Sequence, residues 1–206
     1  MLIKKIILTL SISLLPLSSF ALFEARLTYG LNGAKDALTE VCQGICTGQV
    51  PGMVPLYGLG ADAIVKLPLI PFGFGLRYEK LGLSATSSNM EGKADFTRTA
   101  ALVNYRIIDT ILHIGPIFSY GLAHNGSISV KQNGSSLLDY SASSAESYSL
   151  GLEVGVKPLI VIPLAVGAEG GITQIKLKNA TDAQGNASKD IDLSGYYLKV
   201  FLGLDI

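Results

Sequence analysis

The chain has 206 residues, of which 49% are hydrophobic and only 16% are charged, and its 16 basic and 16 acidic residues cancel. That charged fraction is low for a soluble domain, where about 25% is usual. A nucleic-acid partner is not expected, because phosphate contacts need a basic face. The length suggests a single domain.

The N-terminus has the pattern of a secretory signal peptide. Two lysines at positions 4 and 5 precede an apolar run over 6–17, and Ser19-Phe20-Ala21 supplies the small residues of a cleavage site. The apolar run is short for a membrane span. We therefore expect residues 1–21 to be removed and residues 22–206 to form the mature protein, with an uncleaved anchor helix as the alternative.

The rest of the sequence has no stretch that could cross a membrane as a helix. The most apolar stretch, Pro158 to Ala168, is interrupted by Pro163 and followed by Glu169. Two possibilities remain for an exported protein of this kind, a soluble periplasmic protein and a β-barrel.

Eight segments alternate apolar and less apolar residues with a period of two, which predicts β-strands. In the first segment, Phe23, Ala25 and Leu27 share one face, opposite Glu24 and Arg26. In chain order the segments are 23–31, 57–67, 72–79, 98–107, 112–122, 148–157, 164–173 and 194–206.

Two features favour a membrane barrel over a soluble β-sandwich. The less apolar face of nearly every segment carries a charge, and unpaired ions in a sandwich core would cost several kcal/mol each. In a membrane barrel the apolar face meets lipid and the polar face lines the lumen. The second feature is that aromatic residues gather near the strand ends, as at two membrane interfaces. One rim would hold Phe23, Phe72, Phe74 and Tyr105, and the other Tyr29, Tyr57, Tyr78, Phe118, Tyr120, Tyr148 and Tyr196.

The connections between the segments alternate between short and long. The short ones are 68–71, 109–110 and 158–163, and the longer polar ones are 32–55, 86–94, 123–147 and 178–193. This alternation is typical of an up-and-down barrel with short periplasmic turns. We therefore predict an all-β, eight-stranded antiparallel transmembrane barrel with both termini on the periplasmic side.

With this strand pattern, the mature chain resembles the small outer-membrane barrels of the OmpA-transmembrane-domain and OmpX type. Its closing run, 196–206, looks like the C-terminal signal that barrel-assembly machinery reads. The resemblance implies a monomer in the cell outer membrane, in contact with outer-membrane lipid and lipopolysaccharide. It also implies a partner in the assembly machinery and an extracellular partner reached through the loops.

The charged residues that face inward are the first candidates for a site. Eight strands leave an interior barely wide enough for side chains, so we expect these charges to pair and fill the lumen. A narrow conducting path and catalysis by a lumen carboxylate stay open as alternatives. The residues are Glu24, Arg26, Asp62, Lys66, Arg77, Glu79, Arg98, Arg106, Glu153, Glu169 and Lys199.

Cys42 and Cys46 lie close together in the first outer loop. In an exported protein such a pair predicts a disulfide. Metal binding would need more ligands, and no histidine lies nearby, so neither a metal nor a cofactor is expected.

Two outer segments bear on function. His124, with Ser127 close by, is the candidate for an enzyme site, because some small outer-membrane barrels modify lipid A with histidine and serine. Nothing in the sequence fixes an orienting acid, and a solvated loop histidine is the simpler interpretation.

His113 is expected to face inward and join the polar network. Asn133-Gly134 predicts a tight turn of a hairpin that projects above the membrane.

The leading functional prediction is a non-enzymatic surface barrel, structural in the envelope and adhesive through its outer loops. A projecting hairpin could offer its edge to a partner, and a passive polar loop is the alternative. A narrow ion or solute channel and a lipid A-modifying enzyme are the other two candidates.

Overall fold

The computed structural model describes residues 23–35, 53–67, 70–87, 90–157, 163–182 and 190–205. This part of the chain is built of β-strands, and it holds no helix that is long and apolar enough to cross a membrane. The strands are β1 (Phe23–Lys35), β2 (Met53–Lys66), β3 (Phe72–Ser87), β4 (Met90–Tyr105), β5 (Ile108–Asp109), β6 (Leu112–Gln132), β7 (Ser135–Ala142), β8 (Ser144–Val156), β9 (Leu164–Lys178), β10 (Thr181–Asp182), β11 (Ile191–Asp192) and β12 (Gly195–Asp205).

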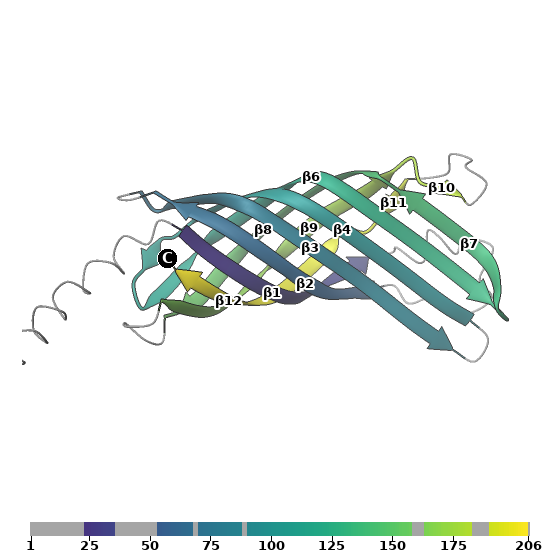
Figure 1. The fold of residues 1–206 in the computed structure, drawn as a ribbon, viewed down its shortest axis with the longest axis horizontal. Coiled ribbons are helices and arrows are strands. Elements are labelled where there is room, and N and C mark those ends of the chain that lie inside the picture. Colours follow the sequence, from purple (N-terminus) through teal and green to yellow (C-terminus); the bar gives the residue numbers. More distant parts are fainter. Residues whose placement is uncertain are drawn as a thin grey trace, which may run out of the picture.

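Eight long strands form a closed antiparallel ring. Each pairs with the next in the order β1, β2, β3, β4, β6, β8, β9 and β12, and β12 pairs with β1 to close the barrel. The prediction of an all-β, eight-stranded antiparallel barrel is therefore confirmed. Figure 1 shows the strands running obliquely along the barrel.

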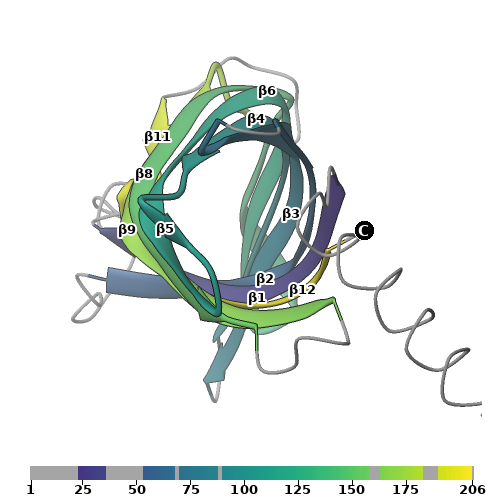
Figure 2. The ribbon, with the colours of Figure 1, turned by 90° about the vertical axis from the view of Figure 1, so that its left-hand side faces the viewer.

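The two ends of the barrel differ. Strands β2, β4, β8 and β12 end, and strands β3, β6 and β9 begin, at the end on the left of Figure 1. We call this the inner end; Figure 2 is seen from this side. At the opposite, outer end, β3, β4, β6 and β7 extend well beyond the neighbouring strands. The segments predicted as the loops 86–94 and 123–147 are mostly strand here, so those two loop predictions were wrong in extent.

A β-bulge in β6 marks the start of this extension. Thr99 pairs with Ala123 and Ala100 pairs with Gly121, so Leu122 is the extra residue of the bulge. Below it the odd-numbered residues of β6 point inward, and above it the even-numbered ones do. From Leu112 to Tyr120 β6 pairs with β8, and from Gly126 on it pairs with β7. The bulge therefore redirects the strand, as bulges commonly do at barrel rims.

The β6–β7 hairpin closes through the turn that the sequence predicted. Asn133 has a φ of 51° and Gly134 a φ of 79°, the left-handed values of a two-residue hairpin turn. Gln132 pairs with Ser135 across it. The predicted Asn133-Gly134 hairpin turn is therefore confirmed.

Replacing Gly134 with alanine is expected to destabilise this hairpin by about 1–2 kcal/mol, because a Cβ is disfavoured at positive φ. Space is not the obstacle, since a Cβ at Gly134 would meet nothing within 4 Å. Hydrogen exchange of the β7 amides should quicken while exchange in β12 stays the same. Asn133→Gly is the matched control, and it should leave β7 exchange unchanged or slower. Equal β7 exchange in Gly134→Ala and the wild type would contradict the expectation.

Candidate functional site

The lumen of the inner half holds a closed ring of four charged side chains. Arg26 donates from Nε to Oε1 of Glu24 (2.8 Å) and from Nη1 to Oε2 of Glu153 (2.7 Å). Arg106 binds the same two carboxylates, donating to Oε2 of Glu24 (2.7 Å) and to Oε1 of Glu153 (3.1 Å). The two arginines thus alternate with the two glutamates, which come from β1 and β8.

Four more charges extend this ring to the inner mouth of the lumen. Lys66 pairs with Asp205 (2.7 Å), and Lys157 pairs with both Asp205 (3.1 Å) and Asp109 (2.8 Å). Lys66 also contacts Oε2 of Glu24 at 2.9 Å, and Arg106 contacts Asp109 at 3.2 Å. The inner cluster, as we call these eight residues, is therefore balanced, with four acidic and four basic side chains.

Three members of the inner cluster were missed by the sequence analysis. They are Asp109, Lys157 and Asp205. Strand alternation places Lys157 and Asp205 on the inward face with Glu153 and Lys199, but they were not counted among the charges of the lumen. Asp109 lies in a connection, where alternation carries no information.

A second cluster lies nearer the outer end. Arg77 binds Asp62 through Nε (2.8 Å) and Nη2 (2.8 Å), and it binds Glu169 through Nη1 (2.8 Å) and Nη2 (2.6 Å). The hydroxyl of Tyr197 donates to Oε1 of Glu169 at 2.7 Å. A guanidinium that engages two carboxylates at once uses the strongest kind of protein hydrogen bond. Arg77 is only 1% exposed, so water does not screen these pairs.

The rest of this outer cluster centres on Glu79, which contacts both Arg98 and Lys199. Arg98 also donates to the hydroxyls of Ser149 (2.8 Å) and Ser119 (3.2 Å). The outer cluster has three acidic residues, Asp62, Glu79 and Glu169, and three basic residues, Arg77, Arg98 and Lys199. All eleven charged residues that the sequence placed in the lumen therefore lie in one of these two neutral clusters.

On the side of the barrel formed by β2, β4 and β6, apolar side chains lie between the two clusters, whereas elsewhere Arg26 lies opposite Asp62, and Glu153 opposite Glu169, across neighbouring strands. Ile64, Leu102 and Ile117 form a buried group, and each is at most 1% exposed. On β2, the apolar Ile64 lies between Asp62 of the outer cluster and Lys66 of the inner cluster. Phe201 adds its ring, over which the guanidinium of Arg26 lies 4.5 Å from the centroid. A Cβ at Gly167 would lie 2.4 Å from the Phe201 ring, so glycine provides the space that the ring fills.

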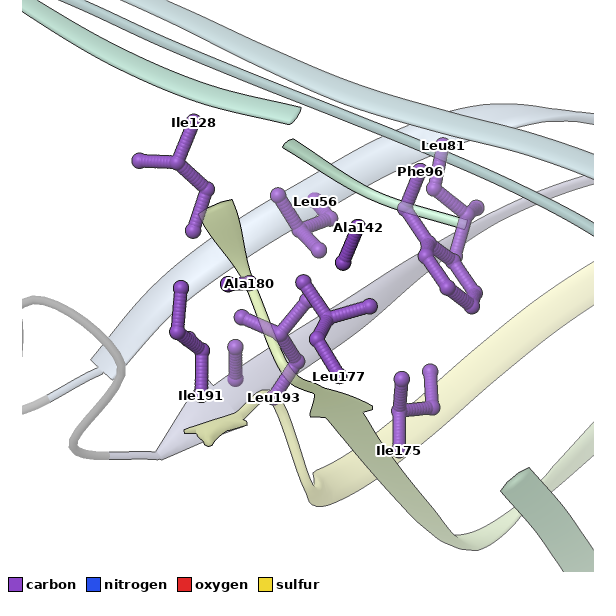
Figure 3. Packing of buried hydrophobic residues seen from close by; sticks show 11 residues of the cluster. Leu56, Leu81, Phe96, Ile128, Ala142, Ile175, Leu177, Ala180, Ile191 and Leu193 are labelled. Carbon is purple, nitrogen blue, oxygen red and sulfur yellow. The ribbon is translucent and has the colours of Figure 1, made fainter. Parts of the chain in front are cut away.

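The outer half of the lumen is lined differently, by apolar side chains that point toward one another (Figure 3). We call this group the outer core. Its members are Ala34, Leu56, Leu81, Phe96, Ile128, Ala142, Ile175, Leu177, Ala180, Ile191 and Leu193, and each is at most 6% exposed. Strands from all sides of the barrel contribute to it, so it ties the extended outer end together. The sequence analysis did not identify this core.

The two histidines differ from their predicted roles. His113 faces inward as predicted and is fully buried, but it does not join the polar network, because neither of its ring nitrogens has a hydrogen-bond partner among the described residues. His124 and Ser127 lie on opposite faces of β6, because the inward positions above the bulge are even-numbered. His124 Nε2 instead lies 2.8 Å from the hydroxyl of Ser147 on β8. The proposed His124–Ser127 pair is therefore wrong.

Other predicted features fall outside the part of the chain that the structure describes. Cys42 and Cys46 lie there, and so do residues 1–21, the predicted signal peptide. Within the described ranges, no group of three or more His, Cys, Asp or Glu side chains could hold a metal ion.

Comparison with known proteins shows similarity of structure only. No protein-family profile and no curated protein matches the sequence. Ail, the attachment invasion locus protein of Yersinia pestis, superposes with a TM-score of 0.52 and 12% identity over 88% of this chain and 94% of its own. A major outer membrane protein from Thermus thermophilus superposes with a TM-score of 0.51 and 10% identity, over 88% and 98%. Neisserial surface protein A gives a TM-score of 0.49 and 14% identity, over 89% and 97%. The superpositions on Ail and on the Thermus thermophilus protein establish a shared fold, and identities this low carry no activity with them.

Proposed function

We propose that this chain spans the outer membrane as a closed barrel and binds a partner at the cell surface with its outer end. The chain has the fold of the small eight-stranded outer-membrane barrels. The proposed role is adhesive and non-enzymatic. It has three parts: the position in the membrane, the closed lumen and the ordered outer end.

The outward face of the barrel supports the position in the membrane. Leucine, isoleucine and valine side chains on this face are exposed, with Leu27 and Leu59 each at 67%, a surface that is stable only in lipid. A ring of six tyrosines borders this surface on the outer side, as expected at a membrane interface. Tyr29, Tyr57, Tyr78, Tyr120, Tyr148 and Tyr196 form this tyrosine ring, with exposures between 41% and 67%.

The two neutral clusters argue against the other candidate functions. Every carboxylate of the outer cluster is bound to at least one arginine or lysine, and every carboxylate of the inner cluster is bound in the same way. A conducting path needs continuous wet space, and a catalytic carboxylate needs access for its substrate. Paired charges that fill a narrow lumen favour neither.

The observation that carries the proposal is the outer core. Above the tyrosine ring, the barrel continues as a sheet with its own buried apolar interior. A membrane anchor does not need this extension, whereas a binding surface gains from it, because a preorganised surface loses less entropy on binding. An attachment role also agrees with the name of the attachment invasion locus protein Ail, which has the same fold.

The β6–β7 hairpin offers the test. In a shortened variant, residues 130–138 are replaced by Asn-Gly, which keeps the pairing of Ser129 with Asp139 and of Ile128 with Tyr140. Bacteria that display the wild-type chain are expected to adhere to monolayers of cultured animal cells, and those with the shortened variant to lose this adhesion. Asn133→Gly, with its full-length hairpin, should adhere like the wild type. Equal outer-membrane amounts are verified by fractionation. Wild-type adhesion no higher than that of bacteria without the chain would overturn the proposal.

A further inference from the structure

The connections at the inner end expose apolar side chains on the outside of the barrel. Leu67 (42%) and Ile70 (50%) lie in the β2–β3 connection, and Ile107 (67%), Ile108 (44%) and Ile111 (63%) lie in the connection from β4 through β5 to β6. Turns that project into water are normally polar. These five side chains continue the apolar outer wall of the barrel beyond the ends of the long strands.

The charges of the same connections point the other way, toward the mouth of the lumen. Asp109 is bound by Arg106 and Lys157, and these side chains belong to the inner cluster. The hydroxyl of Thr110 donates a hydrogen bond to the carbonyl oxygen of Leu112 (3.4 Å). Isoleucine and leucine side chains therefore form most of the outward surface of these connections.

The backbone of these connections is hydrogen-bonded to the neighbouring strands. Three such bonds link a strand end to the adjacent connection: Arg106 N to Pro71 O (2.8 Å), Lys157 N to Ile111 O (2.7 Å) and Asp205 N to Pro163 O (2.7 Å). Within the second connection, Thr110 N donates to Leu112 O at 3.0 Å. Satisfied backbone groups are a requirement for chain segments in hydrocarbon and are not needed for turns in water.

The apolar wall formed by the strands alone is shorter than the apolar band of an outer-membrane barrel. From the tyrosine ring to the inner end, β3 runs from Tyr78 to Phe72 and β6 from Tyr120 to Leu112. With a tilt of about 40° and a rise of about 3.4 Å per residue, these spans give an apolar wall about 16–21 Å high. The apolar band of outer-membrane barrels is about 25 Å tall. The isoleucines of the connections supply the missing height.

We infer that the β2–β3 and β4–β6 connections at the inner end are immersed in the acyl chains of the membrane leaflet on that side, so that this part of the barrel ends within the bilayer instead of projecting from it. This inference rests on the proposed membrane position. Continuity with the lipid-facing wall, closed backbone hydrogen bonds and inward charges all favour lipid as the occupant of this surface over a periplasmic protein.

The absence of tryptophan from the chain makes the test direct. Ile107→Trp and Ile111→Trp each introduce a single fluorescent reporter into the second connection. Leu27→Trp places the reporter on the wall of the barrel, and Asp139→Trp places it on the β6–β7 hairpin. Each variant is refolded in phosphatidylcholine vesicles without any other protein, and its emission is measured with brominated acyl chains and with aqueous iodide.

The expected result is that brominated lipid quenches both isoleucine variants at least half as strongly as Leu27→Trp, while iodide quenches only Asp139→Trp strongly. If iodide quenches Ile107→Trp and Ile111→Trp and brominated lipid quenches them no more than Asp139→Trp, the connections lie in water and the inference is overturned, which leaves the surface free for a protein. A Leu27→Trp reporter that brominated lipid does not quench would instead contradict the membrane position itself. The two failures are thus distinguishable.

Discussion

Replacing Arg77 with methionine is expected to lower the free energy of unfolding by about 3–5 kcal/mol, because it leaves buried carboxylates without a counter-charge. The guanidinium makes four hydrogen bonds to Asp62 and Glu169, which lie on β2 and β9. Methionine keeps much of the side-chain volume but donates no hydrogen bond. Urea titration of the barrel in phospholipid vesicles measures the change.

A triple variant separates the loss of charge balance from the loss of packing. Asp62→Asn, Arg77→Met and Glu169→Gln together remove all three charges, and we expect the triple variant to be more stable than Arg77→Met alone. Lys93→Met is the exposed control, since Lys93 lies 3.9 Å from Asp95 and is 58% exposed. An exposed pair contributes about 0–1 kcal/mol. If Arg77→Met costs no more than Lys93→Met, the ion pairs do not hold the lumen together.

Replacing Phe96 with alanine is expected to cost about 3–5 kcal/mol, the usual loss for a buried phenylalanine. Phe96 is 1% exposed in the outer core, and its ring stacks 6.2 Å from that of His124. The loss should be confined to the outer end, because the ion-paired inner half keeps all of its contacts. Limited proteolysis should therefore cleave β7 faster while the remaining barrel stays intact.

Thr97→Ala serves as the matched control for Phe96→Ala. Thr97 is the next residue on β4, and its side chain points outward. Cleavage of this variant should match that of the wild type. Equal protease resistance of Phe96→Ala and Thr97→Ala would mean that the outer core does not order the outer end.

The inner half of the barrel could be predicted from the sequence because apolar and charged residues alternate there in one consistent pattern along each strand. Outward residues are apolar and inward residues are charged, as Leu27 and Arg26 illustrate on β1. A polar interior inside an apolar wall is the opposite of a soluble core, so the pattern indicated both the strands and the membrane. The balance of charge also indicated that they pair. Which carboxylate each arginine binds could not be predicted, since it depends on strand register and on the bulge in β6.

The outer half could not be predicted because the polarity of the two strand faces reverses within single strands: the inward face changes from charged to apolar, and the outward face from apolar to polar. On β4, the inward position changes from the charged Arg98 to the apolar Phe96, and on β9 it changes from Glu169 to Ile175. In the proposed membrane position the exterior above the tyrosine ring faces water, which accounts for outward residues that become polar and an interior that becomes an ordinary apolar core. Sequence reasoning took each reversal as the end of a strand and the remainder as a loop. The same reversal concealed the outer core.

We propose that neutral ion-pair clusters close the lumen, which leaves the outer end to carry the function. Current recording across a planar lipid bilayer with the refolded chain tests this claim most directly. Insertion is verified beforehand by the quenching of Leu27→Trp. We expect an inserted barrel that shows no unitary conductance. Reproducible unitary currents that change in Glu79→Gln would contradict the closed lumen and would identify a pore lined by the outer cluster.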